Sequence, residues 1–163
     1  MTERAEHREE AEIVGGGAAR ARNDAGNDYV LEDQIGFRLR KAHQRATDDF
    51  IAVMGRFEVT PTQFAALAKL HAAGPLPQSQ LGRLTAMDPA TISGVVQRLT
   101  RRGCVRQSVD PRDGRLAVVS LTAQGAAAAA AMTAAAGAVS ARTLAPLTAR
   151  EAATLLKLLA RLG

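Results

Sequence analysis

The chain has 163 residues, of which 47% are hydrophobic but only 3% aromatic, and it contains no tryptophan. This length suits one domain with or without a tail, and no apolar run approaches the ~20 residues that cross a bilayer, so we expect no membrane contact. The single cysteine excludes an internal disulfide framework and, with the acidic N-terminus, predicts a cytoplasmic protein. A core built largely from alanine and aliphatic residues buries little area per residue, which favours pairing with a second chain.

The net charge of +5 is distributed unevenly along the chain. Residues 1–34 carry four basic and nine acidic side chains, whereas residues 83–115 carry seven basic and three acidic ones. A basic segment of this kind is the electrostatic pattern expected of a nucleic-acid-binding element. A solvated basic surface is the alternative, and charge alone does not separate the two.

The first third of the chain predicts a tail and two helices. Residues 1–31 hold a glycine triplet and Asn/Asp/Gly clusters with almost no apolar periodicity, which predicts a flexible tail. From Asp33 to Phe57, apolar residues recur every three or four positions and predict a long helix. A capping box of Thr60 and Gln63, with proline between them, begins the next helix, which ends at Gly74. The apolar face of that second helix consists of Phe64, Leu67 and Leu70.

A helix-turn-helix follows. A short helix over about residues 78–85, with Leu81 and Leu84 directed inward, precedes a turn near residues 86–87. Asp88 as N-cap and Pro89 in the first turn begin a second helix, which Gly103 ends. Its buried stripe is predicted to be Ile92, Val95, Val96 and Leu99. The residues left to face outward are Ala90, Thr91, Ser93, Gly94, Gln97, Arg98, Arg101 and Arg102.

A charged hairpin and two more helices complete the chain. Residues 104–109 and 116–121 have strand character and flank a turn, Asp110–Arg115, whose Asp-Gly pair favours a tight reversal. An alanine-rich helix is predicted from Thr122 to about Leu144, and a capping box at Thr148 opens a leucine-rich last helix. The fold class is therefore mainly α, a winged helix-turn-helix with a two-stranded β wing and helices at both ends that we expect to form a dimer.

The outward face of the helix that begins at Pro89 indicates DNA binding. It is small and polar at its N-terminal end and basic at its C-terminal end. Such a face fits a major groove while its arginines meet phosphate.

The run from Asp88 through Asp110-Pro-Arg-Asp-Gly-Arg115 to Gly125, together with the element order, resembles the MarR family of bacterial transcriptional regulators. The resemblance covers about residues 32–163, with a DNA-binding lobe of about 60–121 and dimerisation helices of about 32–57 and 122–163. It implies a homodimer that binds a pseudo-palindromic operator in double-stranded DNA, usually as a repressor released by a small ligand. The DNA-binding residues it implies are Pro89, Ala90, Thr91, Ser93, Gly94, Gln97, Arg98, Arg101, Arg112 and Arg115.

Three of these residues have more specific expected roles. Gln97 could pair with adenine, and Arg98 with guanine or phosphate. Arg112, at the tip of the wing, resembles the arginine that enters the flanking minor groove. Asp110 and Arg115 are expected to pair with each other, so a structural role for Arg115 is as reasonable as DNA contact.

The resemblance also implies an effector site between the dimerisation helices and the DNA-binding lobe. Arg40 is the main candidate for holding the carboxylate of an aromatic acid, because a guanidinium can grip it with two parallel hydrogen bonds. A solvated helix face or dimer salt bridges are the alternatives for this arginine-rich stretch. Further candidates are Arg38, His43, Gln44 and His71. For His71, a favourable interaction with the helix dipole is the simpler explanation.

Other functions find little support. His43, His71 and Cys104 are too dispersed to indicate a metal site, and Cys104 is expected to be a small buried strand residue. No phosphate loop, catalytic triad or cofactor fingerprint is present, so we expect neither an enzyme nor a cofactor. The remaining alternative is a dimeric interaction module that keeps the fold without specific operator binding, a possibility that the short Ala90 and Gly94 leave open.

Overall fold

The computed structural model describes residues 29–109 and 117–162, so most of the expected N-terminal tail lies outside the described residues. No helix among them is long and apolar enough to span a membrane. The elements in chain order are η1 (Leu31–Asp33), α1 (Ile35–Met54), η2 (Gly55–Phe57), α2 (Pro61–Ala73), β1 (Leu76–Pro77), α3 (Gln78–Leu84), α4 (Pro89–Arg101), β2 (Val105–Val109), β3 (Ala117–Leu121), α5 (Ala123–Leu144) and α6 (Ala149–Leu159).

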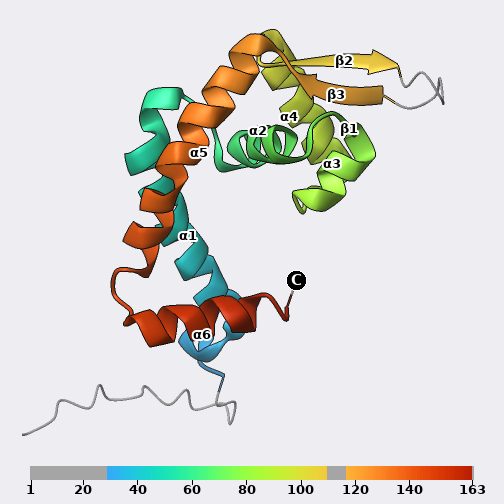
Figure 1. Cartoon of the computed structure of the whole chain (residues 1–163). Helices are drawn as coiled ribbons and strands as arrows, with labels where there is room; N and C mark the ends of the chain where they lie inside the picture. The colour runs from blue at the N-terminus through green and yellow to red at the C-terminus, as the bar shows by residue number, and fades with distance from the viewer. Residues whose placement is uncertain (1–28, 110–116, 163) are drawn as a thin grey trace, which may run out of the picture.

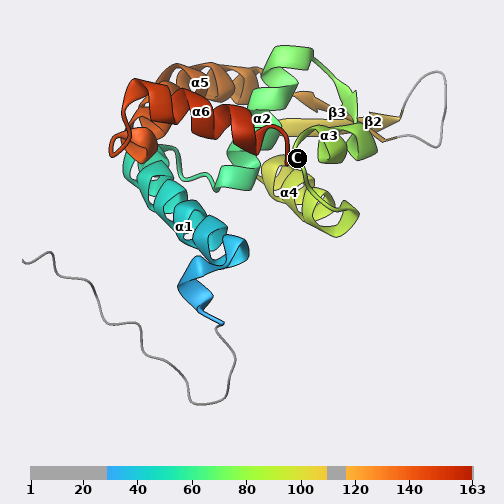
Figure 2. The same ribbon diagram turned by 90° about the horizontal axis from the view of Figure 1, so that it is seen from below.

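The elements form a lobe and a stalk. α2, α3, α4 and the small sheet gather in the lobe, while α1 and α5 pack against each other to form the stalk (Figure 1). α6 follows the end of α5 that is remote from the sheet (Figure 1), and the view in Figure 2 shows α1 and α6 running from there in different directions. The sequence-based expectation of helices flanking a winged helix-turn-helix is confirmed.

Side chains cap four of the helices. Both predicted capping boxes are present, Thr60 with Gln63 at the start of α2 and Thr148 with Glu151 at the start of α6. Asp88 caps α4 as predicted, and Thr122 caps α5 by accepting from the backbone N–H of Gly125 at 3.0 Å. These side chains satisfy amide groups that the first helical turn leaves without a partner, which explains why the starts of these helices could be located from the sequence.

The core lies in the lobe and at the adjoining part of the stalk. The four predicted positions of α4 are all buried, and they pack with side chains of α2, α3 and the sheet. Cys104 is buried at 6% exposure, as its position before β2 predicts. The remaining core residues are Phe50, Met54, Ala66, Leu67, Leu70, Leu76, Leu81, Val105, Val119, Ala129 and Met132.

Polar contacts hold α1 to α5 within the stalk. The carboxylate of Asp49, which is 14% exposed, accepts from Arg142 Nε at 3.3 Å and from Thr143 Oγ1 at 3.1 Å. Arg45 donates in turn to the backbone carbonyls of Arg142 and Thr143, each at 3.3 Å. The two helices are therefore fixed together beyond the apolar core.

The sheet has three antiparallel strands in the order β1-β3-β2. β2 and β3 pair from Val105 opposite Leu121 to Val109 opposite Ala117, close to the predicted hairpin. β1 was not predicted, because a strand of two residues carries no periodic pattern. Leu76 pairs with Val119, so β1 depends on a contact between distant parts of the chain.

Two sequence-based expectations need correction. Leu84 is 47% exposed and does not point into the core. Gly82 occupies the face of α3 that meets α4, where an added Cβ would lie 3.1 Å from Ile92 Cγ2, so the close packing of the two helices turns Leu84 outward. The first α-helix also ends at Met54, since a 3-10 turn and a left-handed Glu58, with φ of 53°, lead into α2.

The start of α5 passes very close to the segment that joins α4 to β2. A Cβ added to Gly125 would lie 1.8 Å from the carbonyl oxygen of Cys104, a separation that no side chain tolerates. We predict that Gly125→Ala forces backbone displacement and lowers the free energy of unfolding by about 2 kcal/mol or more. Chemical denaturation at one fixed protein concentration measures this loss.

Gly137→Ala provides the matched control in the same helix. An added Cβ there meets nothing within 4 Å, so the higher helix propensity of alanine should leave stability equal or raise it by up to about 1 kcal/mol. Equal stability of the Gly125→Ala variant and the wild type would contradict the close approach.

Candidate nucleic-acid interface

The outward face of α4 is accessible along its length. Thr91 and Gly94 are half-buried at its margin. The remaining predicted contact residues of α4 are exposed, namely Pro89, Ala90, Ser93, Gln97, Arg98 and Arg101. The buried stripe on the opposite side fixes this orientation of the helix.

Asp88 organises the N-terminal end of this face. Its carboxylate accepts from the hydroxyl of Thr91 at 2.6 Å and from the backbone N–H of Thr91 at 2.8 Å. The hydroxyl contact is the larger cause, and the backbone contact the next, of a pKa below the usual 3.8 for Asp88. The Thr91 hydroxyl proton is therefore engaged by a carboxylate, which leaves the hydroxyl oxygen and its methyl group as the atoms that Thr91 can offer to a ligand.

Gly94 lies beneath the side chain of Arg98. An added Cβ at Gly94 would be 3.4 Å from Arg98 Nη1, so the guanidinium extends back over the glycine toward the N-terminal end of α4. The small residue in the middle of the face thus makes room for this guanidinium. Because glycine has no side chain, the backbone of α4 is also closer to the helix surface at this position.

A shallow cavity of about 360 Å³ adjoins the C-terminal half of α4. Its lining consists of Arg98, Arg101 and Arg102 together with Gln63 from the first turn of α2. Gln63 is buried, and its Oε1 accepts from the backbone N–H of Thr60 at 3.0 Å. Because three guanidinium groups and no carboxylate line this cavity, its chemistry suits an oxyanion such as a phosphate.

Arg102 differs from the other two arginines. Its guanidinium donates to the backbone carbonyls of Glu58 and Phe57, the latter at 3.2 Å. Among the described residues, Arg98 and Arg101 form no ion pair or side-chain hydrogen bond. Sequence reasoning placed Arg102 on the outward basic face without finding these contacts, which join residues more than forty positions apart.

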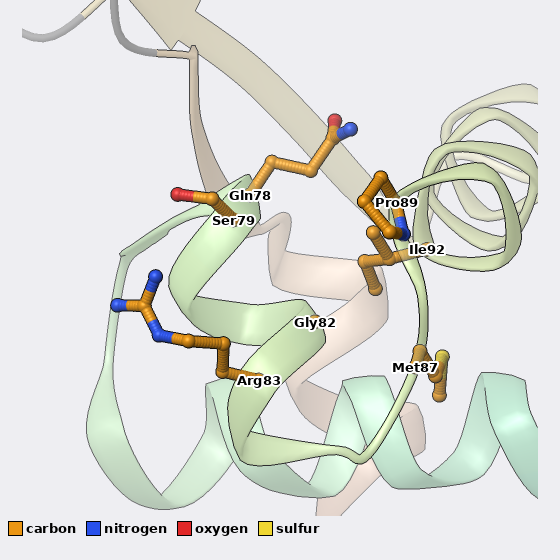
Figure 3. A pocket seen from close by; sticks show the side chains of 7 residues that line it. All are labelled: Gln78, Ser79, Gly82, Arg83, Met87, Pro89 and Ile92. Carbon is orange, nitrogen blue, oxygen red and sulfur yellow. The ribbon is translucent and has the colours of Figure 1, made fainter.

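A second cavity, of about 300 Å³, lies between α3 and the start of α4 (Figure 3). Figure 3 shows Gln78 and Ser79 at the beginning of α3, with Pro89 and Ile92 on the α4 side. Gly82, Arg83 and Met87 complete its lining. Sequence reasoning did not single out Ser79 and Arg83, which are exposed beside the outward face of α4.

The base of the wing is ordered by side-chain contacts. Gln107 Nε2 donates to Gln78 Oε1 at 3.0 Å, which ties β2 to the start of α3, and Arg106 Nε donates to Ser120 Oγ at 3.1 Å across the hairpin. The turn of the wing, with Asp110, Arg112 and Arg115, lies outside the described residues. The roles expected of these three residues therefore stay predictions.

The candidate effector residues are exposed, and none of them lines either of the two cavities described above. Arg40, His43 and Gln44 are exposed on α1, with Gln44 donating to Asp48 Oδ1 at 3.0 Å. Arg38 pairs with Asp33 at 3.3 Å, close to the N-terminal end of α1. His71 is exposed in the last turn of α2.

Comparison with known proteins identifies the family to which this fold belongs. A family model described as MarR family matches residues 57–116. The chain is 53% identical to a probable transcriptional regulator from Pseudomonas aeruginosa, with a TM-score of 0.78 over 82% of this chain and 100% of that one. The chain belongs to the MarR family.

Two further relatives are similar to this member of the MarR family. BpsR of Bordetella bronchiseptica, whose DNA binding is regulated by 6-hydroxynicotinic acid, is 31% identical, with a TM-score of 0.79 over 83% of this chain and 97% of BpsR. The transcriptional repressor NicR of Pseudomonas putida is 43% identical over 99 residues, which are 61% of this chain and 63% of NicR. The family and these relatives are transcriptional regulators and not enzymes.

Proposed function

We propose that this chain is a dimeric transcriptional regulator that binds a pseudo-palindromic operator and releases it when an aromatic carboxylate binds. The observation that carries the proposal is the outward face of α4, held from behind by four buried aliphatic side chains and bearing two arginines with no described acidic partner. In this proposal α4 enters the major groove. The oxyanion-suited cavity beside its C-terminal half receives a backbone phosphate.

The DNA contacts proposed are those of the α4 face and of the wing. Gln97 and Arg98 would read base edges or phosphate, and Arg101 would meet phosphate. Arg112 would enter the minor groove that flanks the site read by α4. Arg115 would support the turn of the wing or add a phosphate contact.

Exposed apolar residues on the stalk support the homodimer. No residue of α6 is buried, and no other described element packs extensively against it. The apolar residues left open on α6 and after it are Leu155, Leu156, Leu158, Leu159 and Leu162, with exposures of 38–73%. Ile35 and Leu39 of α1 are exposed by 68% and 41% as well. A monomer that left this surface in water would be unusual, so a second copy of the chain is the occupant we propose.

We predict that Leu155→Glu converts the dimer into a monomer, because it places a charge in the proposed apolar contact of α6. Analytical ultracentrifugation measures the change in mass. Lys157→Gln, which changes the charge by the same amount and whose neighbours three and four residues away include none of the exposed leucines, should leave the dimer intact. A wild-type monomer at micromolar concentration, or an intact Leu155→Glu dimer, would contradict the interface.

We predict that the protein prefers a duplex from its own upstream region over random duplex by about 10³-fold or more at ~0.15 M salt. Arg112→Ala should weaken that specific binding roughly tenfold or more, with unchanged thermal stability, because it removes only the minor-groove contact. Labelled-duplex titration measures both affinities. Absence of any sequence preference would favour a dimeric interaction module that has kept the fold.

An aromatic carboxylate is the effector class we infer. BpsR is regulated by such a compound, and Arg40 is an exposed guanidinium on α1 with no described ion pair. His43 lies about two turns before the buried Phe50, so it shares the α1 face that packs on the core farther along the helix. Arg40 and His43 could therefore meet a ligand held between the stalk and the lobe.

We predict that Arg40→Gln weakens the binding of an aromatic carboxylate by roughly 10–100-fold, because charge-assisted hydrogen bonds are lost, and spares DNA affinity. Calorimetric titration with 6-hydroxynicotinate and related aromatic carboxylates measures this effect. Arg38→Gln removes the same charge from a residue already paired with Asp33 and should bind as the wild type does. Normal release of DNA by the ligand in Arg40→Gln would refute the assignment of this residue.

A further inference from the structure

The residue that follows the recognition helix connects its C-terminal end to the junction after the first stalk helix. Arg102, which follows the last residue of α4, directs its guanidinium away from the outward face and donates to the carbonyls of Phe57 and Glu58. A guanidinium is planar and rigid, so two adjacent carbonyls held by it are fixed in direction as well as in distance. The guanidinium of Arg102 thus already donates hydrogen bonds within the protein, unlike those of Arg98 and Arg101 among the described contacts.

The carbonyls that Arg102 holds belong to the junction between α1 and α2. This junction reverses the chain through the 3-10 turn η2 and through Glu58, whose left-handed backbone is uncommon for a residue with a side chain. Glu58 N–H donates to the Gly55 carbonyl at 3.0 Å, and Arg56 stacks over the Phe57 ring at 4.7 Å. The carbonyls that Arg102 contacts thus lie three and four residues after the end of α1, within one tightly turned segment.

The same end of α4 is also fastened to the second stalk helix. Thr122 Oγ1 donates to the Gly103 carbonyl at 2.6 Å, and Thr122 N–H donates to the Cys104 carbonyl at 3.0 Å. The close approach of Gly125 to Cys104 lies one turn farther along α5. Both stalk helices therefore meet the recognition helix at its C-terminal end.

The N-terminal end of α4 is held differently. The described hydrogen bonds of Asp88 are made within its own first turn, and α3 packs beside it. Neither contact involves the stalk. Among the described hydrogen bonds, those of Arg102 join the C-terminal end of α4 directly to the junction that follows α1.

We propose that Arg102 is a positioning residue that couples the orientation of α1 to that of the recognition helix, and that it is not a phosphate contact. The inference rests on the proposed operator binding, since orientation matters only if α4 reads DNA. It deepens that function by naming the joint through which a change in the stalk reaches the reading face.

The salt dependence of DNA binding separates positioning from phosphate contact. Each phosphate contact contributes about −0.9 to the slope of log affinity against log salt. Arg102→Gln should lower the affinity for the specific duplex roughly tenfold or more while leaving the slope and the affinity for random duplex unchanged. Arg101→Gln, the same loss of charge one residue earlier, should reduce the magnitude of the slope by about 0.9.

Arg102→Lys adds a test by conservative replacement. Lysine keeps the charge but cannot hold two carbonyls in one planar geometry, so it should restore specific affinity only in part. Full restoration of specific affinity by lysine would overturn the inference. So would a salt slope that Arg102→Gln reduces as much as Arg101→Gln does, and so would unchanged specific affinity in a folded Arg102→Gln protein.

A readout without DNA keeps this inference separate from the proposed function. Hydrogen–deuterium exchange of residues 55–60 and 98–104 should accelerate together in Arg102→Gln, and neither segment should change in Arg101→Gln. If the wild-type protein shows no operator preference, the proposed function is refuted. The exchange measurement then still decides whether Arg102 couples the two segments. Unchanged exchange at residues 55–60 in Arg102→Gln would overturn the coupling itself.

Discussion

The burial of one face of α4 is the constraint on which the rest of the lobe depends. Each of its four aliphatic side chains contributes about 1.5–3 kcal/mol when fully removed from water, so the helix cannot rotate about its axis without exposing part of that surface. The outward residues are therefore presented in a fixed direction. The same burial requires a glycine at position 82, since α3 must come close enough to cover Ile92.

The stalk leaves more of its apolar surface exposed than the lobe does. The core residues of α1 and α5 lie where these helices meet the lobe, whereas Ile35, Leu39 and the leucines of α6 remain open. An alanine-rich α5 gives the stalk little buried volume of its own. Association of two chains would thus complete a core that one chain leaves unfinished, and it would set the spacing between two copies of α4.

Local signals explain what the sequence could predict. The capping boxes at Thr60 and Thr148, the Asp88-Pro89 start and the Gly103 end depend on contacts within a few residues, so their chemistry is visible in a short stretch of sequence. Contacts between distant segments were not visible. β1 exists through pairing with β3, and Leu84 faces outward because Gly82 meets α4. The candidate DNA-binding face was predictable from local sequence, because it consists of the α4 residues that lie opposite a periodic buried stripe.

The arginines of α4 show why charge density alone could not assign roles. Arg98, Arg101 and Arg102 look equivalent in the sequence and line one cavity in the structure. Yet the Arg102 guanidinium donates to two backbone carbonyls, while no acidic partner is described for the other two. A guanidinium that donates to two backbone carbonyls of its own chain would have to break those contacts to bind phosphate, and the Phe57 and Glu58 carbonyls would then lose a charged donor. Arg98 and Arg101 meet no such cost, so a basic cluster of three residues divides into two that can bind an external anion and one that holds the helix in place.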